Sequence, residues 1–320
     1  MLLYIFSSDM GFGKDIRADK NFPRTVRIIV LFIFTFFLID MIIGTILTEG
    51  LDRYYGLGSN APLALVGHSQ TMLGIDKVIL EKELGLKVAK YTREGVNVAD
   101  RQMMIKQLLS DNKELTYVIY GVDSWLFTGE GLSKNSYALF YPFMDDPVIR
   151  AYIKKHASLS EFLTHRLVKT TRFNEQLISG SFRGYLGNWS NLKYGHVNIQ
   201  RLKESIKNNT FRKINTNSAN INIFINTLDV LKVSGVKVIL VYIPTIDLLN
   251  EAAGPEFDRS IQFFQSMEIK FDNVIFLNYL EPYAHNHNLF YDPIHLNPEG
   301  QLEITYQLIK DLKKHFNADY

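Results

Sequence analysis

The sequence of 320 residues contains no cysteine. Disulfide bonds, cysteine-based metal sites and thiol catalysis are therefore excluded, and no thiol indicates a redox compartment. The chain also has little net charge, because 35 Lys and Arg residues nearly balance 33 Asp and Glu residues. A formal charge of +2 gives no reason to expect nucleic acid as a partner. We find no internal repeat, no low-complexity tract, no phosphate-binding glycine loop and no nucleotide fingerprint.

The composition is that of a folded protein. Apolar residues make up 47% of the chain and charged residues 21%, which is ordinary for a globular domain with a sizeable core. The length is sufficient for one large domain or two small ones.

One apolar run, residues 28–47, has about the length needed to cross the hydrocarbon core of a bilayer. Basic residues precede this run, and only Arg53 follows closely; the preceding ones are Lys14, Arg17, Lys20, Arg24 and Arg27. The positive-inside rule then predicts a cytoplasmic basic segment at 1–27 and an extracytoplasmic chain after residue 50. We interpret 28–47 as a retained single-pass anchor in a bacterial cell membrane. A cleavable signal peptide and a buried soluble helix are the alternatives.

Asp40 lies inside the apolar run, where an ionised carboxylate is energetically unfavourable. One interpretation is that it contacts a polytopic membrane protein. The other is that it is a lone residue neutralised by protonation.

From residue 60 onward, strand patterns alternate with helical patterns, which predicts βαβ units and a parallel sheet. The predicted strands are 63–66, 87–91, 116–120, 236–243 and 274–277. We therefore predict an α/β domain over 60–320, a flavodoxin-like three-layer sandwich with strand order 2-1-3-4-5. Residues 127–215 break the alternation and are rich in aromatic and basic residues. We predict that they form an inserted, partly helical cap over the strand ends, although they could also be a structural elaboration packed on the sheet.

A serine and an Asp-x-x-His motif are the candidate catalytic residues. Ser69 follows the first predicted strand, and Asp292 and His295 precede the last predicted helix. Both positions fall at the carboxyl ends of the strands, where open α/β sheets hold their ligands. A serine becomes a nucleophile when a histidine takes its proton and a carboxylate orients that histidine. Taken singly, Ser69 could be a helix cap and Asp292 a turn residue.

This combination of motifs resembles the SGNH, or GDSL-like, hydrolase superfamily. Val66-Gly67-His68-Ser69 matches its first block, with His68 where the family has Asp. The resemblance implies an oxyanion hole formed by the N–H groups of Ser69 and Gly95. Gly121-Val122-Asp123 falls where the family often has Gly-x-Asn, so Asp123 occupies the third-block position. A carboxylate donates no hydrogen bond unless it is protonated. We expect Asp123 to point away from the oxyanion, toward a basic residue of the insertion such as Arg150, Arg166 or Arg183.

An anchor joined to an SGNH-like domain is similar to the membrane-tethered branch that includes the teichoic acid D-alanyl transfer and alginate O-acetylation proteins. That resemblance implies a membrane-anchored extracytoplasmic esterase or O-acyltransferase that needs no cofactor. Its substrate would be a cell-surface glycan or glycolipid, and a polytopic membrane acyltransferase would be a partner. The alternative function is a non-catalytic accessory or scaffold protein of a polysaccharide modification complex.

A metal site is a competing interpretation of the C-terminal motif. His285, His287, Asp292 and His295 are close in sequence and could together bind a metal ion. Their surroundings have the composition of a loop, so we expect ordinary polar contacts there and no metal in the site.

Overall fold

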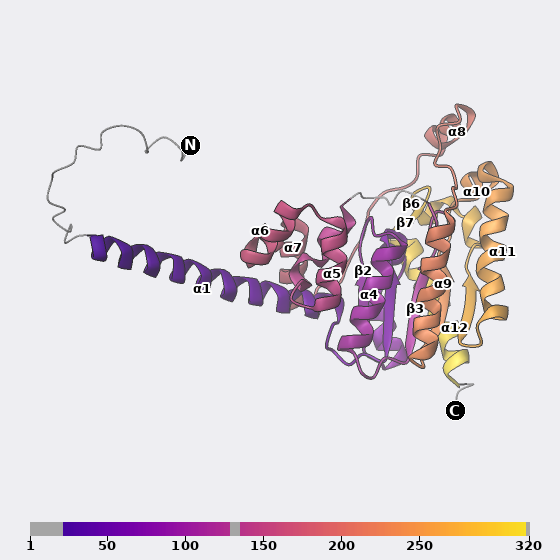
Figure 1. Cartoon of the computed structure of the whole chain (residues 1–320). Coiled ribbons are helices and arrows are strands. Elements are labelled where there is room, and N and C mark those ends of the chain that lie inside the picture. Colours follow the sequence, from indigo (N-terminus) through magenta and orange to yellow (C-terminus); the bar gives the residue numbers. More distant parts are fainter. Residues whose placement is uncertain (1–21, 129–134, 318–320) are drawn as a thin grey trace.

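A parallel five-stranded sheet forms the centre of the protein (Figure 1). The computed structural model describes residues 22–128 and 135–317. The order of the strands is β2-β1-β3-β4-β5, and every neighbouring pair is parallel. The strands are β1 Leu63–Gly67, β2 Val88–Thr92, β3 Tyr117–Val122, β4 Lys237–Tyr242 and β5 Val274–Asn278. The predicted strands, their order and the flavodoxin-like class are thereby confirmed.

Helices cover both faces of the sheet, which is why its strands are almost continuously apolar. Alternate residues of β1 face opposite sides: Ala64 and Val66 contact the core under α4, α9 and α11, and Leu63 and Leu65 contact the core under α3 and α12. The helices around the sheet are α2 Ser69–Gly74, α3 Lys77–Leu84, α4 Val98–Asp111, α9 Ser218–Val233, α10 Asp247–Ala253, α11 Pro255–Lys270 and α12 Pro298–Asn317. Between β5 and α12 lie η3 Tyr283–His285, η4 His287–Leu289 and a hairpin of β6 Phe290–Asp292 and β7 His295–Leu296.

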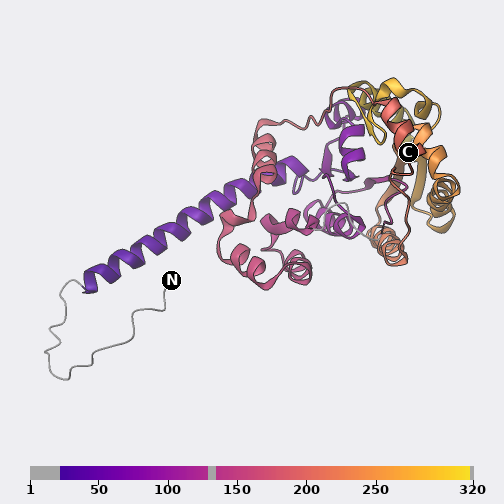
Figure 2. The same cartoon turned by 90° about the horizontal axis from the view of Figure 1, so that it is seen from above.

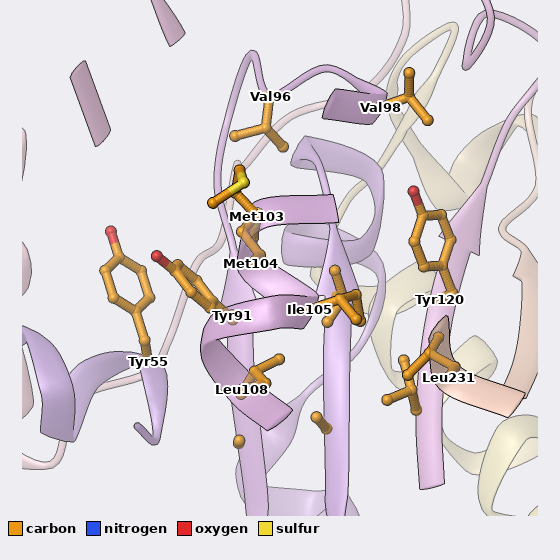
Figure 3. Packing of buried hydrophobic residues seen from close by; sticks show 14 of the residues in the cluster. Tyr55, Tyr91, Val96, Val98, Met103, Met104, Ile105, Leu108, Tyr120 and Leu231 are labelled. Carbon is orange, nitrogen blue, oxygen red and sulfur yellow. The ribbon is translucent and has the colours of Figure 1, made fainter. Parts of the chain in front are cut away.

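The N-terminal helix α1, Phe22–Tyr55, projects from the domain and also enters its core. Among the described residues, one helical segment is long and apolar enough to cross a membrane. It is Arg24–Tyr55 of this helix, with a mean hydropathy of 2.6. The helix continues beyond residue 47 because Leu51 and Tyr55 are fully buried in the domain. Figure 3 shows the ring of Tyr55 beside that of Tyr91 in β2, with 4.5 Å between the ring centroids. Residues 1–21 of the basic segment expected at 1–27 lie outside the described residues.

The segment predicted as a cap is divided between two places. Its elements are η1 Ser136–Phe143, α5 Pro147–His156, α6 Leu159–Leu167, η2 Lys169–Arg172, α7 Glu175–Leu186 and α8 Ile199–Lys207. The part from η1 to α7 lies beside β2, where α7 and η2 pack along α1 (Figures 1 and 2). Helix α8 lies at the carboxyl ends of the strands, close to α10. Helix α7 reaches the carboxyl end of β2, where Gln176 Oε1 accepts from Arg93 at 2.7 Å. The segment from α5 to α7 thus packs mainly along α1, through η2 and α7, and not over the sheet.

Candidate active site

Ser69 is the first residue of α2, directly after β1 and its neighbour His68. The turn from strand to helix is tight: a Cβ added to Gly67 or to Gly121 would overlap the Oγ1 atom of Thr71. These two glycines let β1, β3 and α2 approach closely enough to place the Ser69 hydroxyl at the carboxyl edge of the sheet. Its side chain is nearly buried there.

The β6–β7 hairpin carries the other two residues. Asp292 Oδ1 accepts hydrogen bonds from the backbone N–H groups of Ile294 and His295, both at 2.9 Å. The second oxygen, Oδ2, lies 2.8 Å from His295 Nδ1. The three-residue spacing thus lets one carboxylate shape the turn and orient the imidazole. Gln70 Nε2 donates to the carbonyl of Ile294 at 3.0 Å, which ties the hairpin to α2.

The structure brings Ser69, His295 and Asp292 into one hydrogen-bonded row. His295 Nε2 lies 2.7 Å from Ser69 Oγ, on the ring edge opposite the contact with Asp292. Burial raises the pKa of Asp292. The His295 ring and the two backbone N–H groups lower it by more, so the pKa lies below its ordinary value. An ionised Asp292 requires the ring proton on Nδ1, which leaves the Nε2 lone pair facing the serine hydroxyl.

The two residues expected to form an oxyanion hole lie on adjacent strand ends. Ser69 N–H belongs to the first turn of α2, where amide groups have no acceptor within the helix. Gly95 follows β2 with φ of +75°, a conformation that suits glycine. The turn that carries it begins where Arg93 N–H donates to Gly67 O at 3.2 Å. In the part of the chain that the structure describes, neither the Ser69 nor the Gly95 amide donates to a protein acceptor.

Asp123 is fully buried, and its closest partners differ from those expected. Its Oδ2 atom lies 2.9 Å from His68 Nε2 and 3.6 Å from Arg101 Nη2, and its Oδ1 atom accepts from Trp125 N–H at 2.9 Å. Arg150, Arg166 and Arg183 are not among these contacts, but another basic residue of the insertion, Arg212, also lowers the pKa of Asp123 by its charge. Burial raises the pKa of Asp123, but His68 and Arg101 lower it well below its ordinary value.

Sequence reasoning missed Arg101. It lies on α4 at the spacing of the buried residues Met104, Ile105 and Leu108, and its Nη1 atom donates to Gly121 O at 2.8 Å. A charge on the apolar face of a helix was the available signal, because a buried guanidinium requires acceptors.

The four residues considered as a metal site lie in two separate groups. His285 Nδ1 and His287 Nε2 contact the two carboxylate oxygens of Asp247 at 2.8 and 2.7 Å, while Asp292 and His295 contact each other. Within residues 22–128 and 135–317, no group of three or more His, Asp or Glu side chains has an arrangement that could hold a metal ion. A shared site for all four residues is therefore contradicted.

Comparisons with known proteins give neighbours in solved structures. No family model matches the chain, and no curated protein matches it significantly. A GDSL-like lipase from Bacteroides thetaiotaomicron is 11% identical, with 80% of this chain and 89% of the lipase covered and a TM-score of 0.37. A protein assigned as an acylhydrolase in Bacteroides fragilis is 10% identical, with 79% and 86% covered and a TM-score of 0.38. The chain itself has the strand order and the serine-to-Asp-x-x-His arrangement of an SGNH/GDSL-like hydrolase fold.

Proposed function

We propose that this protein is a membrane-anchored serine esterase or O-acyltransferase. The observation that carries the proposal is the position of His295, which lies within hydrogen-bond distance of both Ser69 Oγ and Asp292 Oδ2. A histidine held between a serine and an ionised carboxylate is the arrangement that activates a serine for attack on an ester.

In the proposed reaction, Ser69 Oγ attacks the acyl carbonyl while His295 Nε2 takes the hydroxyl proton. Asp292 holds the ring and stabilises its positive charge. The N–H groups of Ser69 and Gly95 stabilise the negative oxygen of the tetrahedral intermediate. His295 then gives its proton to the departing alcohol, which leaves an acyl ester on Ser69. Water or the hydroxyl group of an acceptor attacks that ester, and His295 takes a proton again.

A groove whose lining does not include Ser69, Asp292 or His295 is the candidate site for a sugar-containing acceptor. It has a volume of about 470 Å³ and extends from the turn of Arg93 and Glu94, next to Gly95, to α7. Side chains that hydrogen-bond sugar hydroxyls line it, including Gln176, Arg183 and Asn191. We propose that the acceptor is an extracytoplasmic glycan or glycolipid. A polytopic acyltransferase as partner rests on the family resemblance alone, because the Asp40 carboxylate is bound by Lys169 and Thr170 of this chain.

The test of this proposal is a pair of alanine variants. We expect Ser69→Ala and His295→Ala each to lower kcat for hydrolysis of p-nitrophenyl acetate by a thousandfold or more, on the order seen for triad residues. The double variant should lose little more than either single one, because triad residues act as a unit. A fluorophosphonate probe should label the unaltered chain on Ser69, as measured by peptide mass.

Ser266→Ala, on the exposed surface of α11, is the matched control and should react like the unaltered chain. If the unaltered chain hydrolyses no ester and a folded Ser69→Ala variant keeps full surface-glycan modification in cells, the scaffold function is correct and the proposed enzyme is not.

A further inference from the structure

The helices α6 and α7 expose a row of large apolar side chains. Leu159, Leu163 and Leu167 recur every fourth residue on α6, and Phe182 and Leu186 are four residues apart on α7. Each of these five side chains is between 47% and 79% exposed. Residues spaced by four lie on one side of a helix. We call this set the α6–α7 apolar face; a soluble protein rarely leaves such a face uncovered.

The α6–α7 apolar face is attached to α1 by specific polar contacts. The Asp40 carboxylate accepts hydrogen bonds from the N–H groups of Lys169 and Thr170 at 2.7 and 2.8 Å, and from Thr170 Oγ1 at 2.6 Å. On the other side of η2, Tyr185 Oη donates to Ile46 O at 2.8 Å. These contacts fix η2 and α7 beside the part of α1 between residues 40 and 46, within the predicted anchor.

The length of α1 then sets the depth of this face. A helix rises about 1.5 Å per residue, so a hydrocarbon core of about 30 Å that begins after Arg27 ends near Leu47. Asp40 would lie roughly 20 Å into this core, in the half that faces the outside. Elements bonded to residues 40–46 therefore lie at the level of the outer leaflet. We propose that the α6–α7 apolar face is immersed in the outer leaflet of the membrane that α1 crosses.

The charges near this face are arranged to suit such an environment. Asp145 contacts Arg166, Lys169 and Arg172 at 3.0, 3.1 and 3.2 Å, so these three basic side chains of α6 and η2 share one counter-charge. Paired charges are the form in which ionic groups are tolerated at membrane depth. The carboxylate of Asp40 likewise receives donors on both oxygens.

The immersion has a consequence for the groove, and this step rests on the proposed function. Helix α7 lines the groove with Gln176, Gly180 and Arg183, and it carries Phe182 and Leu186 on the apolar face. One helix therefore lies between lipid and groove. The groove opens close to the level of the lipid headgroups, where a lipid-linked acceptor would present its sugar.

The absence of native cysteine allows a clean test by site-directed labelling. The full chain with Leu163→Cys or Leu186→Cys, labelled with bimane, is reconstituted into vesicles of phosphatidylcholine and phosphatidylglycerol. Phe32→Cys in α1 is the reference for lipid, and Lys203→Cys on exposed α8 is the reference for water. We expect lipids with a nitroxide on the acyl chain to quench positions 163 and 186 several-fold more than position 203. Aqueous iodide should quench them several-fold less.

The proposal is overturned if positions 163 and 186 are quenched by iodide as strongly as position 203 while position 32 is quenched by lipid. In that case the anchor is inserted and the face awaits a protein partner instead. Absence of lipid quenching at position 32 would also overturn it, because α1 would not cross the membrane. Fluorescence quenching needs no turnover, so these outcomes are independent of whether the chain is an esterase.

Discussion

At the residue scale, the side chain before Ser69 determines what residue is needed next to it on the adjacent strand. His68 Nδ1 accepts the N–H of Gln70 at 3.1 Å and so caps α2. The ring proton is then on Nε2, which faces Asp123. Burial lowers the pKa of His68, which favours this neutral form. A histidine at 68 therefore requires an acceptor at 123, and the two departures from the family pattern, His68 and Asp123, compensate each other.

This pairing predicts coupled effects on stability. We expect Asp123→Asn to destabilise the protein by about 3 kcal/mol, because Arg101 loses its buried counter-charge. His68→Asp should also destabilise it, since two carboxylates would be adjacent. The double variant should be more stable than the sum of the two changes, by about 1–3 kcal/mol. Urea unfolding of the full chain in detergent, with exposed Asp229→Asn as the control, measures all four values. Strict additivity would show that His68 and Asp123 do not interact.

Site residues could be predicted where their positions follow from the ends of the strands, and not where they follow from the packing of helices. Ser69, His295 and Asp292 were found because parallel strands end at one edge, and positions after strand ends converge there. The partners of Asp123 could not be predicted, because they depend on the packing of α4 against β3. The family pattern gave its position, but only the structure brings His68 and Arg101 to it.

At the element scale, Asp40 acts as an anchor for η2. It lies on α1, yet it satisfies the first amide groups of a short helix more than a hundred residues away. Neither interpretation from the sequence, a polytopic partner or a protonated lone residue, included this contact.

We expect Asp40→Ala to leave the sheet intact and loosen the segment from η2 to α7. Two partly buried N–H groups would lose their acceptor, at up to about 1–3 kcal/mol for each unsatisfied group. Hydrogen exchange at Lys169 and Thr170 should therefore become faster, while exchange in β1 and β3 stays unchanged. Asp229→Ala, which removes an exposed carboxylate from α9, is the control. Unchanged exchange at Lys169 and Thr170 would show that other contacts hold η2.

The elements also differ in how well their sequences predicted them. The five strands are short apolar runs between turn residues, and local pattern was sufficient to place them. Between a cap and a packed elaboration, the sequence could not decide for the insertion, because periodicity indicates an apolar side of a helix without showing what covers it. The predicted membrane-spanning segment 28–47 did not indicate that the helix continues into the domain, because Leu51 and Tyr55 are buried through contacts with residues distant in sequence.

At the scale of the whole molecule, the orientation of the chain across the membrane is a prediction from charge. Basic residues precede the apolar run and only Arg53 follows closely, so the α/β domain should face outside. Protease added to intact spheroplasts should digest the domain and leave a short protected N-terminal fragment. A cytoplasmic protein of the same cells should stay intact, as a control for lysis. If the domain is fully protected as well, the predicted orientation is wrong.

Helix α1 continues into the core without a break, and Tyr55 at its end packs on Tyr91 of the sheet. A domain on a flexible linker samples a volume that grows with linker length. Here the helix and the sheet move together, so an anchored molecule can diffuse laterally and rotate about the membrane normal but cannot change its height. Ser69 would then work within a thin layer parallel to the bilayer. A long polymer would be modified only where its chain passes through that layer, whereas a membrane-bound precursor would be presented at the same height every time.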